Sequence, residues 1–127
     1  MVRLATVVLG SALLMMPLTA MGEDVPDPLS VEWQGKKPCE SLFEDEQIRV
    51  LRCTIPPGAV HVRHSHIASF GYVLSGGKSQ VEDAEGSRQG ESTTDEYWNG
   101  DPIPWHEVKN VGDTTQRYLL VEKKYQH

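Results

Sequence analysis

The chain has 127 residues, with 12 basic and 18 acidic side chains and a formal net charge of −6. This length supports one compact domain. The negative charge, with no cluster of basic residues to offset it, argues against nucleic acid as a partner.

Residues 1–22 have the order of a secretory signal peptide. Arg3 supplies a positive charge, an apolar run from Leu4 to Ala20 follows, and small residues lie around Gly22. The alternative, an uncleaved membrane anchor, needs ~20 apolar residues, and Pro17 interrupts a run that is short for this purpose. We therefore expect cleavage after Gly22 or Ala20, which leaves a periplasmic or secreted protein that is not attached to the membrane.

Residues 23–39 are expected to form an extended N-terminal arm, with one short edge strand around residues 31–33. Cys39 lies at the end of this arm, and Cys53 lies in the first strand predicted after it. An oxidising compartment allows a disulfide between them, which would fix the arm to the rest of the domain. Two unlinked thiols are the alternative, because the sequence does not give the distance between the cysteines.

After the arm, segments rich in β-branched and apolar residues alternate with turns that contain glycine or proline. No segment after residue 22 has the period of an amphipathic helix. The pattern predicts a single all-β domain, an antiparallel sandwich or barrel. The expected strands are 48–55, 59–66, 70–74, 80–83, 93–98, 105–111 and 115–123.

Three histidines are candidates for a metal site. His64 and His66 are two residues apart in a predicted strand, so their side chains point to the same face and can reach one ion. His106, at the start of another strand, is the candidate third ligand. His61 has the opposite parity from His64 and is expected to face outward, unless a bulge near Arg63 reverses it. Taken alone, the His-x-His pair also fits two surface histidines on an edge strand.

The spacing of Gly58, His64, His66 and Gly77 resembles the first motif of the cupin superfamily, and 106–110 resembles the end of the second motif. The resemblance extends over about residues 40–124 and is to small exported cupins with a single domain. It implies that residues 40–127 form a jelly-roll barrel, a double-stranded β-helix, with a metal site inside its mouth. It also implies a possible homodimer, since cupins are commonly dimers.

One departure from the family changes the expected ligand set. The carboxylate ligand of the first motif falls at Phe70, so at most three protein histidines hold the ion. Gln80 is the candidate fourth ligand, with Asp95 and Glu96 as further candidates. Three neutral imidazoles leave positions open for water or substrate, and they suit one divalent ion of Fe, Zn, Ni, Mn or Cu without choosing among these metals.

Aromatic residues near the two motifs are expected to line the pocket, although each is also explained as core. Phe70 is expected to point inward by parity with the histidines. Such walls favour a small, partly apolar organic ligand. The predicted pocket-lining residues are Phe70, Tyr72, Trp98 and Trp105.

The predicted function is a metal-dependent enzyme that acts on a small organic molecule. Within this class a dioxygenase-like oxidoreductase with iron is preferred, because a three-histidine site resembles those of some cupin dioxygenases. An isomerase or lyase, in which the ion polarises a carbonyl, fits nearly as well. The alternative is a non-enzymatic module that binds a small ligand or a metal, and the missing carboxylate supports it. The sequence identifies no nucleophile and no general base.

Overall fold

A computed structural model describes residues 24–126, and the expected signal peptide lies outside these residues. The described part of the chain contains no helix long and apolar enough to cross a membrane. Its regular structure consists of β-strands. They are β1 (Cys39–Glu44), β2 (Ile48–Ile55), β3 (Val60–His66), β4 (Ser69–Ser75), β5 (Gly77–Asp83), β6 (Gly86–Ser92), β7 (Tyr97–Gly100), β8 (Ile103–Asn110) and β9 (Gln116–Lys123).

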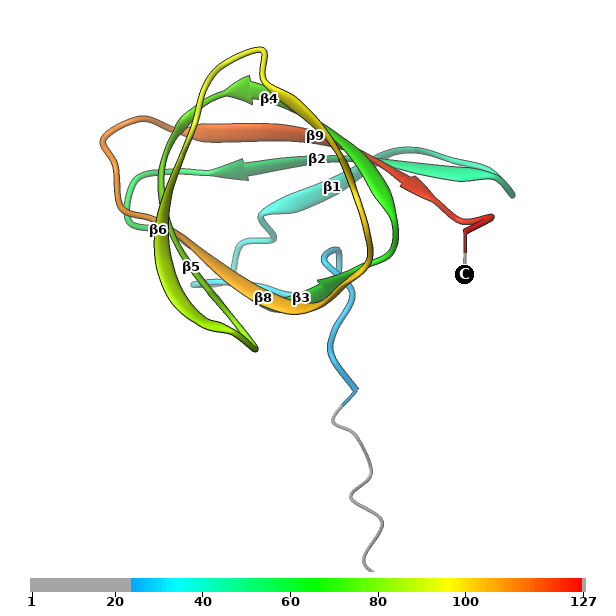
Figure 1. Ribbon diagram of the computed structural model, residues 1–127, viewed down its shortest axis with the longest axis horizontal. Coiled ribbons are helices and arrows are strands. Elements are labelled where there is room, and N and C mark those ends of the chain that lie inside the picture. Colours follow the sequence, from blue (N-terminus) through cyan, green and yellow to red (C-terminus); the bar gives the residue numbers. More distant parts are fainter. Residues whose placement is uncertain (1–23, 127) are drawn as a thin grey trace, which may run out of the picture.

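The strands form two antiparallel sheets that face each other across the interior of a barrel (Figure 1). One sheet has the order β1-β2-β9-β4-β7, and the other has the order β3-β8-β5-β6. Strands distant in sequence therefore lie side by side, as β9 does between β2 and β4. This is the double-stranded β-helix that the sequence predicts, and the predicted fold class is confirmed.

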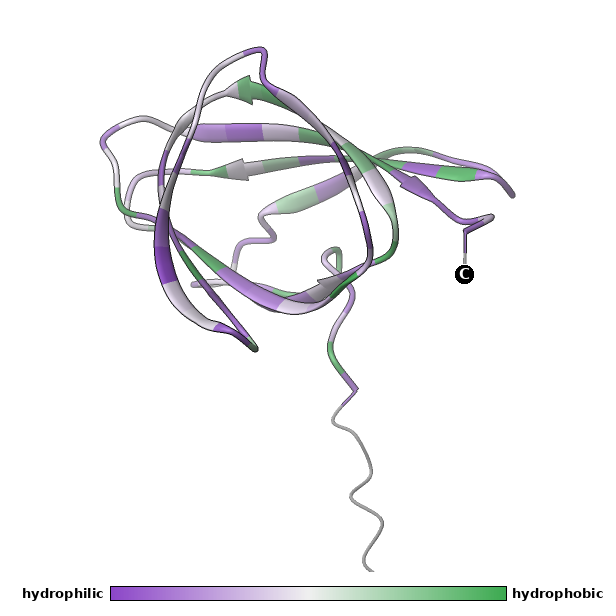
Figure 2. Cartoon of the chain, viewed as in Figure 1, coloured by the Kyte–Doolittle hydropathy of each residue, from purple (hydrophilic) through white to green (hydrophobic). Residues whose placement is uncertain are grey.

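Alternation of buried and more exposed residues explains the best-formed strands. In β2, Leu51, Cys53 and Ile55 are buried and alternate with half-buried residues. Burying a side chain the size of leucine stabilises the fold by about 1.5–3 kcal/mol, so the register of β2 is strongly fixed. By contrast, β6 is hydrophilic and exposed along most of its length, and it is drawn in purple and white in Figure 2.

Strands β1 and β6 are absent from the sequence prediction. Neither strand has a regular alternation of apolar residues, and β6 contains only glycine and polar residues. A turn before Gly86, which has a φ of 123°, closes a hairpin in which β6 pairs with β5 along its whole length. The predicted strand 93–98 is displaced to β7, because Asp95 has a φ of 73° and forms part of a turn. The predicted edge strand at 31–33 is a single bridge between Trp33 and Lys36.

The N-terminal arm is attached to the barrel by several contacts. Cys39 lies directly opposite Cys53 in the β1–β2 register, with 4.0 Å between the Cα atoms, and the two residues form a disulfide. The carbonyl oxygen of Pro26 accepts a hydrogen bond of 3.0 Å from the amide of Ser65 in β3. Asp27 forms an ion pair of 2.7 Å with Arg49 in β2. The arm therefore lies beside β3, the strand that carries the histidine pair.

Candidate metal centre

The pairing of β3 with β8 brings the three predicted histidines together. His64 lies directly opposite His106 in the register, and His66 follows two residues later on the same strand. The Nε2 atom of His64 is 2.9 Å from Nε2 of His66 and 2.9 Å from Nε2 of His106. His64 is fully buried, and one nitrogen from each ring lies within 4.8 Å of the others. The cluster can therefore hold one metal ion.

A fourth histidine also points inward, which the sequence analysis expected to face outward. His61 is 3% exposed, and its ring stacks on that of His64 with 3.5 Å between centroids. The cause is a bulge. Between His61 and His64 the register advances by three residues in β3 and by two in β8, from Val108 to His106. One extra residue in β3 reverses the parity of the strand, so His61 and His64 both face the interior.

Hydrogen bonds fix the orientation of two of the three rings. Nδ1 of His64 donates to the carbonyl oxygen of Val62 at 2.7 Å, and Nδ1 of His66 donates to Oε1 of Glu122 at 3.4 Å. In a neutral imidazole, a proton on Nδ1 leaves Nε2 as a lone-pair donor. When both rings have Nδ1 as the protonated nitrogen, their Nε2 lone pairs face each other across 2.9 Å. A cation bound by both atoms removes this repulsion, so the residues fit a metal ion.

Burial favours the neutral form of His64 and His106. It lowers the pKa of His64 to about 4 and the pKa of His106 to about 3, because a charged imidazolium loses its hydration inside the barrel. Neighbouring histidines lower both pKa values further. Neutral imidazole is the form that binds transition metals, so protons do not compete strongly for these nitrogens at neutral pH.

Glu122 in β9 is a part of the site that the sequence analysis missed. Its side chain is fully buried, and its second oxygen accepts a hydrogen bond of 2.6 Å from Nε of Arg49. Glu122 lies behind His66, at the nitrogen that faces away from the cluster, so it orients this ring and is not itself a ligand. The available signal was parity, because Glu122 follows Tyr118 and Leu120 at alternate, inward-facing positions of β9.

A cavity of about 350 Å³ adjoins the histidines. Its wall is largely apolar and includes Val81, Val108 and Leu120. Trp98 lines this cavity, as the sequence predicts, and its ring lies over Gly71 on the neighbouring strand. A Cβ atom at Gly71 would be 2.1 Å from the Trp98 ring, so glycine leaves the space that this ring occupies.

The other three aromatic residues predicted to line the cavity are not part of its wall. Phe70 is 37% exposed and stacks on Tyr97, and Tyr72 donates a hydrogen bond of 2.8 Å to Asp95. The parity argument failed for Phe70 because residues 67–68, between β3 and β4, change the direction in which the following side chains point. Trp105 precedes the inward-facing His106 on β8, so it faces outward, where the Arg63 guanidinium lies 4.2 Å above its ring.

The predicted oxygen ligands are also located elsewhere. Gln80 lies between Ser79 and Val81, which both face the cavity, so its own side chain points outward and donates to Ser87. Asp95 accepts the hydrogen bond from Tyr72, and Glu96 accepts one from the backbone amide of residue 93 at 2.9 Å. None of the three reaches the histidines.

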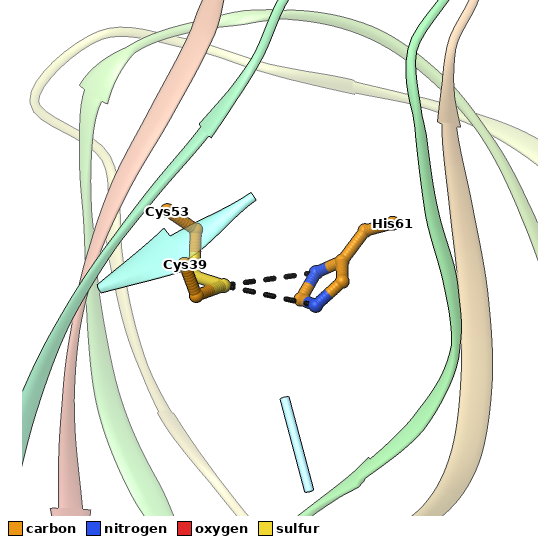
Figure 3. A group of neighbouring side chains, drawn as sticks. All are labelled: Cys39, Cys53 and His61. Carbon is orange, nitrogen blue, oxygen red and sulfur yellow. Dashed lines mark hydrogen bonds between the residues drawn. A yellow bond between two sulfur atoms is a disulfide. The ribbon is translucent and has the colours of Figure 1, made fainter. Parts of the chain in front are cut away.

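A second cluster of ligand-type residues lies beside the first and contains Cys39, Cys53 and His61 (Figure 3). Sγ of Cys39 lies 3.7 Å from Nε2 and 3.9 Å from Nδ1 of His61, and Nε2 is also 3.4 Å from the carbonyl oxygen of Pro28. Both sulfur atoms are joined in the disulfide. In this form the cluster therefore lacks the thiolates that metal ions bind.

No protein-family model and no curated protein sequence matches the chain. Among solved structures it is similar to a cupin domain from Bordetella pertussis Tohama I, with 23% identity over 68% of this chain and 91% of that one and a TM-score of 0.64. A conserved protein with a double-stranded β-helix domain from Klebsiella pneumoniae has 15% identity over 78% and 87% of the two chains, with a TM-score of 0.56. An RmlC-like cupin from Shewanella frigidimarina has 16% identity over 70% and 77%, with a TM-score of 0.50.

These similarities establish the fold of the chain as the cupin fold. They agree with the element order and the two facing sheets described above. They do not assign an activity, because one fold supports many reactions.

Proposed function

We propose that this chain binds one divalent transition-metal ion through His64, His66 and His106 and acts as a metal-dependent enzyme on a small organic molecule in the adjoining cavity. The observation that carries the proposal is the convergence of three imidazoles, those of the buried His64 and His66 and the half-buried His106, in which Nε2 of His64 lies 2.9 Å from Nε2 of each of the other two. Nitrogen–metal bonds of ~2.0–2.1 Å allow one ion to reach all three.

The residues around the ion would determine what it binds. Three histidines without a carboxylate leave its positive charge uncompensated within the cluster and leave coordination positions open on the cavity side. The apolar wall excludes water and favours a partly apolar organic molecule. Glu122 and Val62 hold two of the imidazoles in one orientation. When bound, the ion would supply Lewis-acid chemistry or, if it is iron, redox chemistry of the oxygenase type. An oxygenase is our preferred reaction class, ahead of an isomerase or lyase.

We also propose that the protein works in the periplasm or outside the cell. The signal-like segment 1–22 supports this location. The Cys39–Cys53 disulfide supports it as well, because such bonds persist in oxidising compartments.

A non-enzymatic module that binds a small ligand is the second candidate. It is favoured by the lining of the cavity. Among residues 24–126, Glu91 on the exposed strand β6 is the one acidic residue of this lining. Glu122, the buried carboxylate, is held by Arg49 and does not line the cavity. Within residues 24–126, no carboxylate other than Glu91 lines the cavity to act as a general base beside the histidines.

Metal analysis of the purified protein tests the first proposal. We expect close to one equivalent of a transition metal after reconstitution, and less than a tenth of an equivalent in His64→Ala and His106→Ala. Gln80→Ala is the matched control, because this side chain points outward, and it should keep full occupancy. Less than a tenth of an equivalent in the unmodified protein would overturn the proposal.

Turnover separates the two candidates. Oxygen consumption by the iron-loaded protein with a panel of diketones, thiols and aromatic diols is expected for an oxygenase. Stabilisation of the protein against heat by one of these compounds, without its conversion, indicates the binding module instead.

A further inference from the structure

The cavity has a second polar end, away from the three histidines. Three hydroxyl groups line it there, from Ser79 in β5, Ser92 at the end of β6 and Tyr118 in β9, and we refer to them as the hydroxyl cluster. Ser79 lies opposite Asn110 in the β5–β8 register, four residues along β8 from His106. At about 3.3 Å per residue, the backbone positions at the two ends of the cavity are roughly 13 Å apart along the strand.

Two of these hydroxyl groups donate their protons in hydrogen bonds within the protein. Ser79 Oγ donates to Oε1 of Gln116 at 2.8 Å, and the Tyr118 hydroxyl donates to the same oxygen. Gln116 is fully buried, and its Nε2 donates to the carbonyl oxygen of Lys78 at 2.8 Å, which fixes the orientation of the amide. Ser79 and Tyr118 therefore have only lone pairs left to offer, and they act as acceptors toward the cavity. Burial also raises the pKa of Tyr118, so its proton is retained.

The third hydroxyl group differs. Ser92 Oγ lies near the Tyr118 hydroxyl and is buried, but it makes no hydrogen bond of normal geometry within residues 24–126. Buried polar groups in folded proteins are nearly always paired, so an unpaired hydroxyl in a cavity wall indicates a missing partner. The Tyr118 hydroxyl oxygen is a nearby acceptor for the proton of Ser92, and a ligand hydroxyl that takes this place lets the cluster offer both acceptors and a donor.

We propose that the hydroxyl cluster binds a neutral hydroxyl group at the far end of a ligand whose other end lies at the three histidines. A hydroxyl group is both donor and acceptor, so it can donate to Ser79 or Tyr118 and accept from Ser92. The binding of one ligand at both the histidines and the hydroxyl cluster rests on the proposed function, because it needs a metal ion at the histidines. Recognition of the hydroxyl group itself needs no metal.

Charge and length further restrict which ligands the cavity can bind. Among residues 24–126, Arg88 is the one Lys or Arg residue of the cavity lining, and it forms an ion pair of 2.7 Å with Asp83. A carboxylate group on the ligand would therefore be buried without a free cation to pair with. If the side chains at both ends point straight into the cavity, this backbone separation of ~13 Å less a metal bond of ~2 Å and a hydrogen bond of ~2.8 Å leaves about 8 Å for the ligand. A six-membered ring with substituents at opposite positions has about this reach. Between the ends, Val81 and Val108 provide an apolar wall.

The test compares two metal-binding probes by calorimetry on the metal-loaded protein: benzohydroxamic acid and 4-hydroxybenzohydroxamic acid. We expect the probe with the distal hydroxyl to bind about three- to tenfold more tightly, which is the effect of one or two added hydrogen bonds. In Ser92→Ala and Tyr118→Phe this advantage should fall below about twofold, with the affinity for benzohydroxamic acid unchanged. Ser87→Ala, on the same strand but facing outward, is the matched control and should keep the advantage.

Equal affinities for the two probes, or an advantage that survives in both variants, would overturn the inference. A second pair, p-cresol and toluene, carries no metal-binding group and is measured on metal-free protein by chemical-shift changes. A preference for p-cresol that Ser92→Ala removes supports the hydroxyl cluster even if the histidines bind no metal. No preference for p-cresol counts against the cluster, whatever the metal content.

Discussion

Two clusters of metal-binding residue types touch each other inside this barrel, and they differ in which atoms are free. In the cluster of His64, His66 and His106, hydrogen bonds to Nδ1 of two rings direct Nε2 toward a common centre. In the cluster of Cys39, Cys53 and His61, the two sulfur atoms are bonded to each other. The rings of His61 and His64 stack at 3.5 Å, so the clusters are direct neighbours.

Residue type and proximity therefore do not by themselves define a metal site. Both clusters are largely buried, and in each of them the possible ligand atoms lie within 4.8 Å of one another. Residues of both clusters line the cavity, but the sulfur atoms of the second cluster are bonded to each other, whereas Nε2 atoms of the three-histidine cluster converge with their lone pairs available. The disulfide cluster instead joins the start of β1 to the middle of β2, which stabilises the barrel. The comparison predicts that the two clusters respond differently to substitution.

The largest effect is expected from removal of the Cys39–Cys53 disulfide, which should make the protein less stable without loss of bound metal. Cys39 and Cys53 are separated by 14 residues, and a disulfide that closes a loop of this length stabilises a protein by about 3 kcal/mol. In the double variant Cys39→Ala/Cys53→Ala, we expect the free energy of unfolding to fall by about this amount. Urea denaturation measures the loss, and metal analysis at a temperature where the variant is folded should still give close to one equivalent. If the folded variant binds no metal, the two clusters form one functional unit and the comparison fails.

Much of this architecture could be predicted from the sequence, because strand periodicity and motif spacing are local signals. The bounds of β2 were predicted without error, and the same-face argument for His64 and His66 holds within their strand. Errors arose where parity was carried across a break in the strand. Because of the bulge before His64, the side chain of His61 points inward and not outward. Because of residues 67–68 before β4, the side chain of Phe70 points outward and not inward.

The contribution of β9 could not be predicted from local patterns. Glu122 reaches His66 only because β9 pairs with β4 and β2, which places the last strand beside elements from the first half of the chain. Likewise, Ser79 and Tyr118 share Gln116 as a partner although they are distant in sequence. Such contacts follow from the order of strands in the sheets, which the sequence alone did not specify.

An intermediate effect is expected at Glu122, which connects the three-histidine cluster to the barrel. In Glu122→Gln, the hydrogen bond to Nδ1 of His66 loses its charged acceptor, and removal of such a partner typically lowers metal affinity 10- to 100-fold. Competition with a chelator of known affinity measures this change. Glu40→Gln is the matched control, because Glu40 forms an ion pair with Arg52 in an exposed position. An unchanged affinity in Glu122→Gln would show that the ring of His66 is positioned by packing alone.

The smallest effect is expected at Asp27, which pairs with Arg49, the residue that also pairs with Glu122 behind His66. Its side chain is 47% exposed, so its ion pair with Arg49 is screened by water and contributes only about 0–1 kcal/mol to stability. In Asp27→Asn we expect less than a threefold change in metal affinity, because Arg49 keeps both of its contacts to the buried carboxylate. The same chelator competition measures it, with Glu122→Gln as the reference for a large effect. A loss as large as that of Glu122→Gln would show that the N-terminal arm, and not the barrel alone, sets the geometry of the histidine cluster.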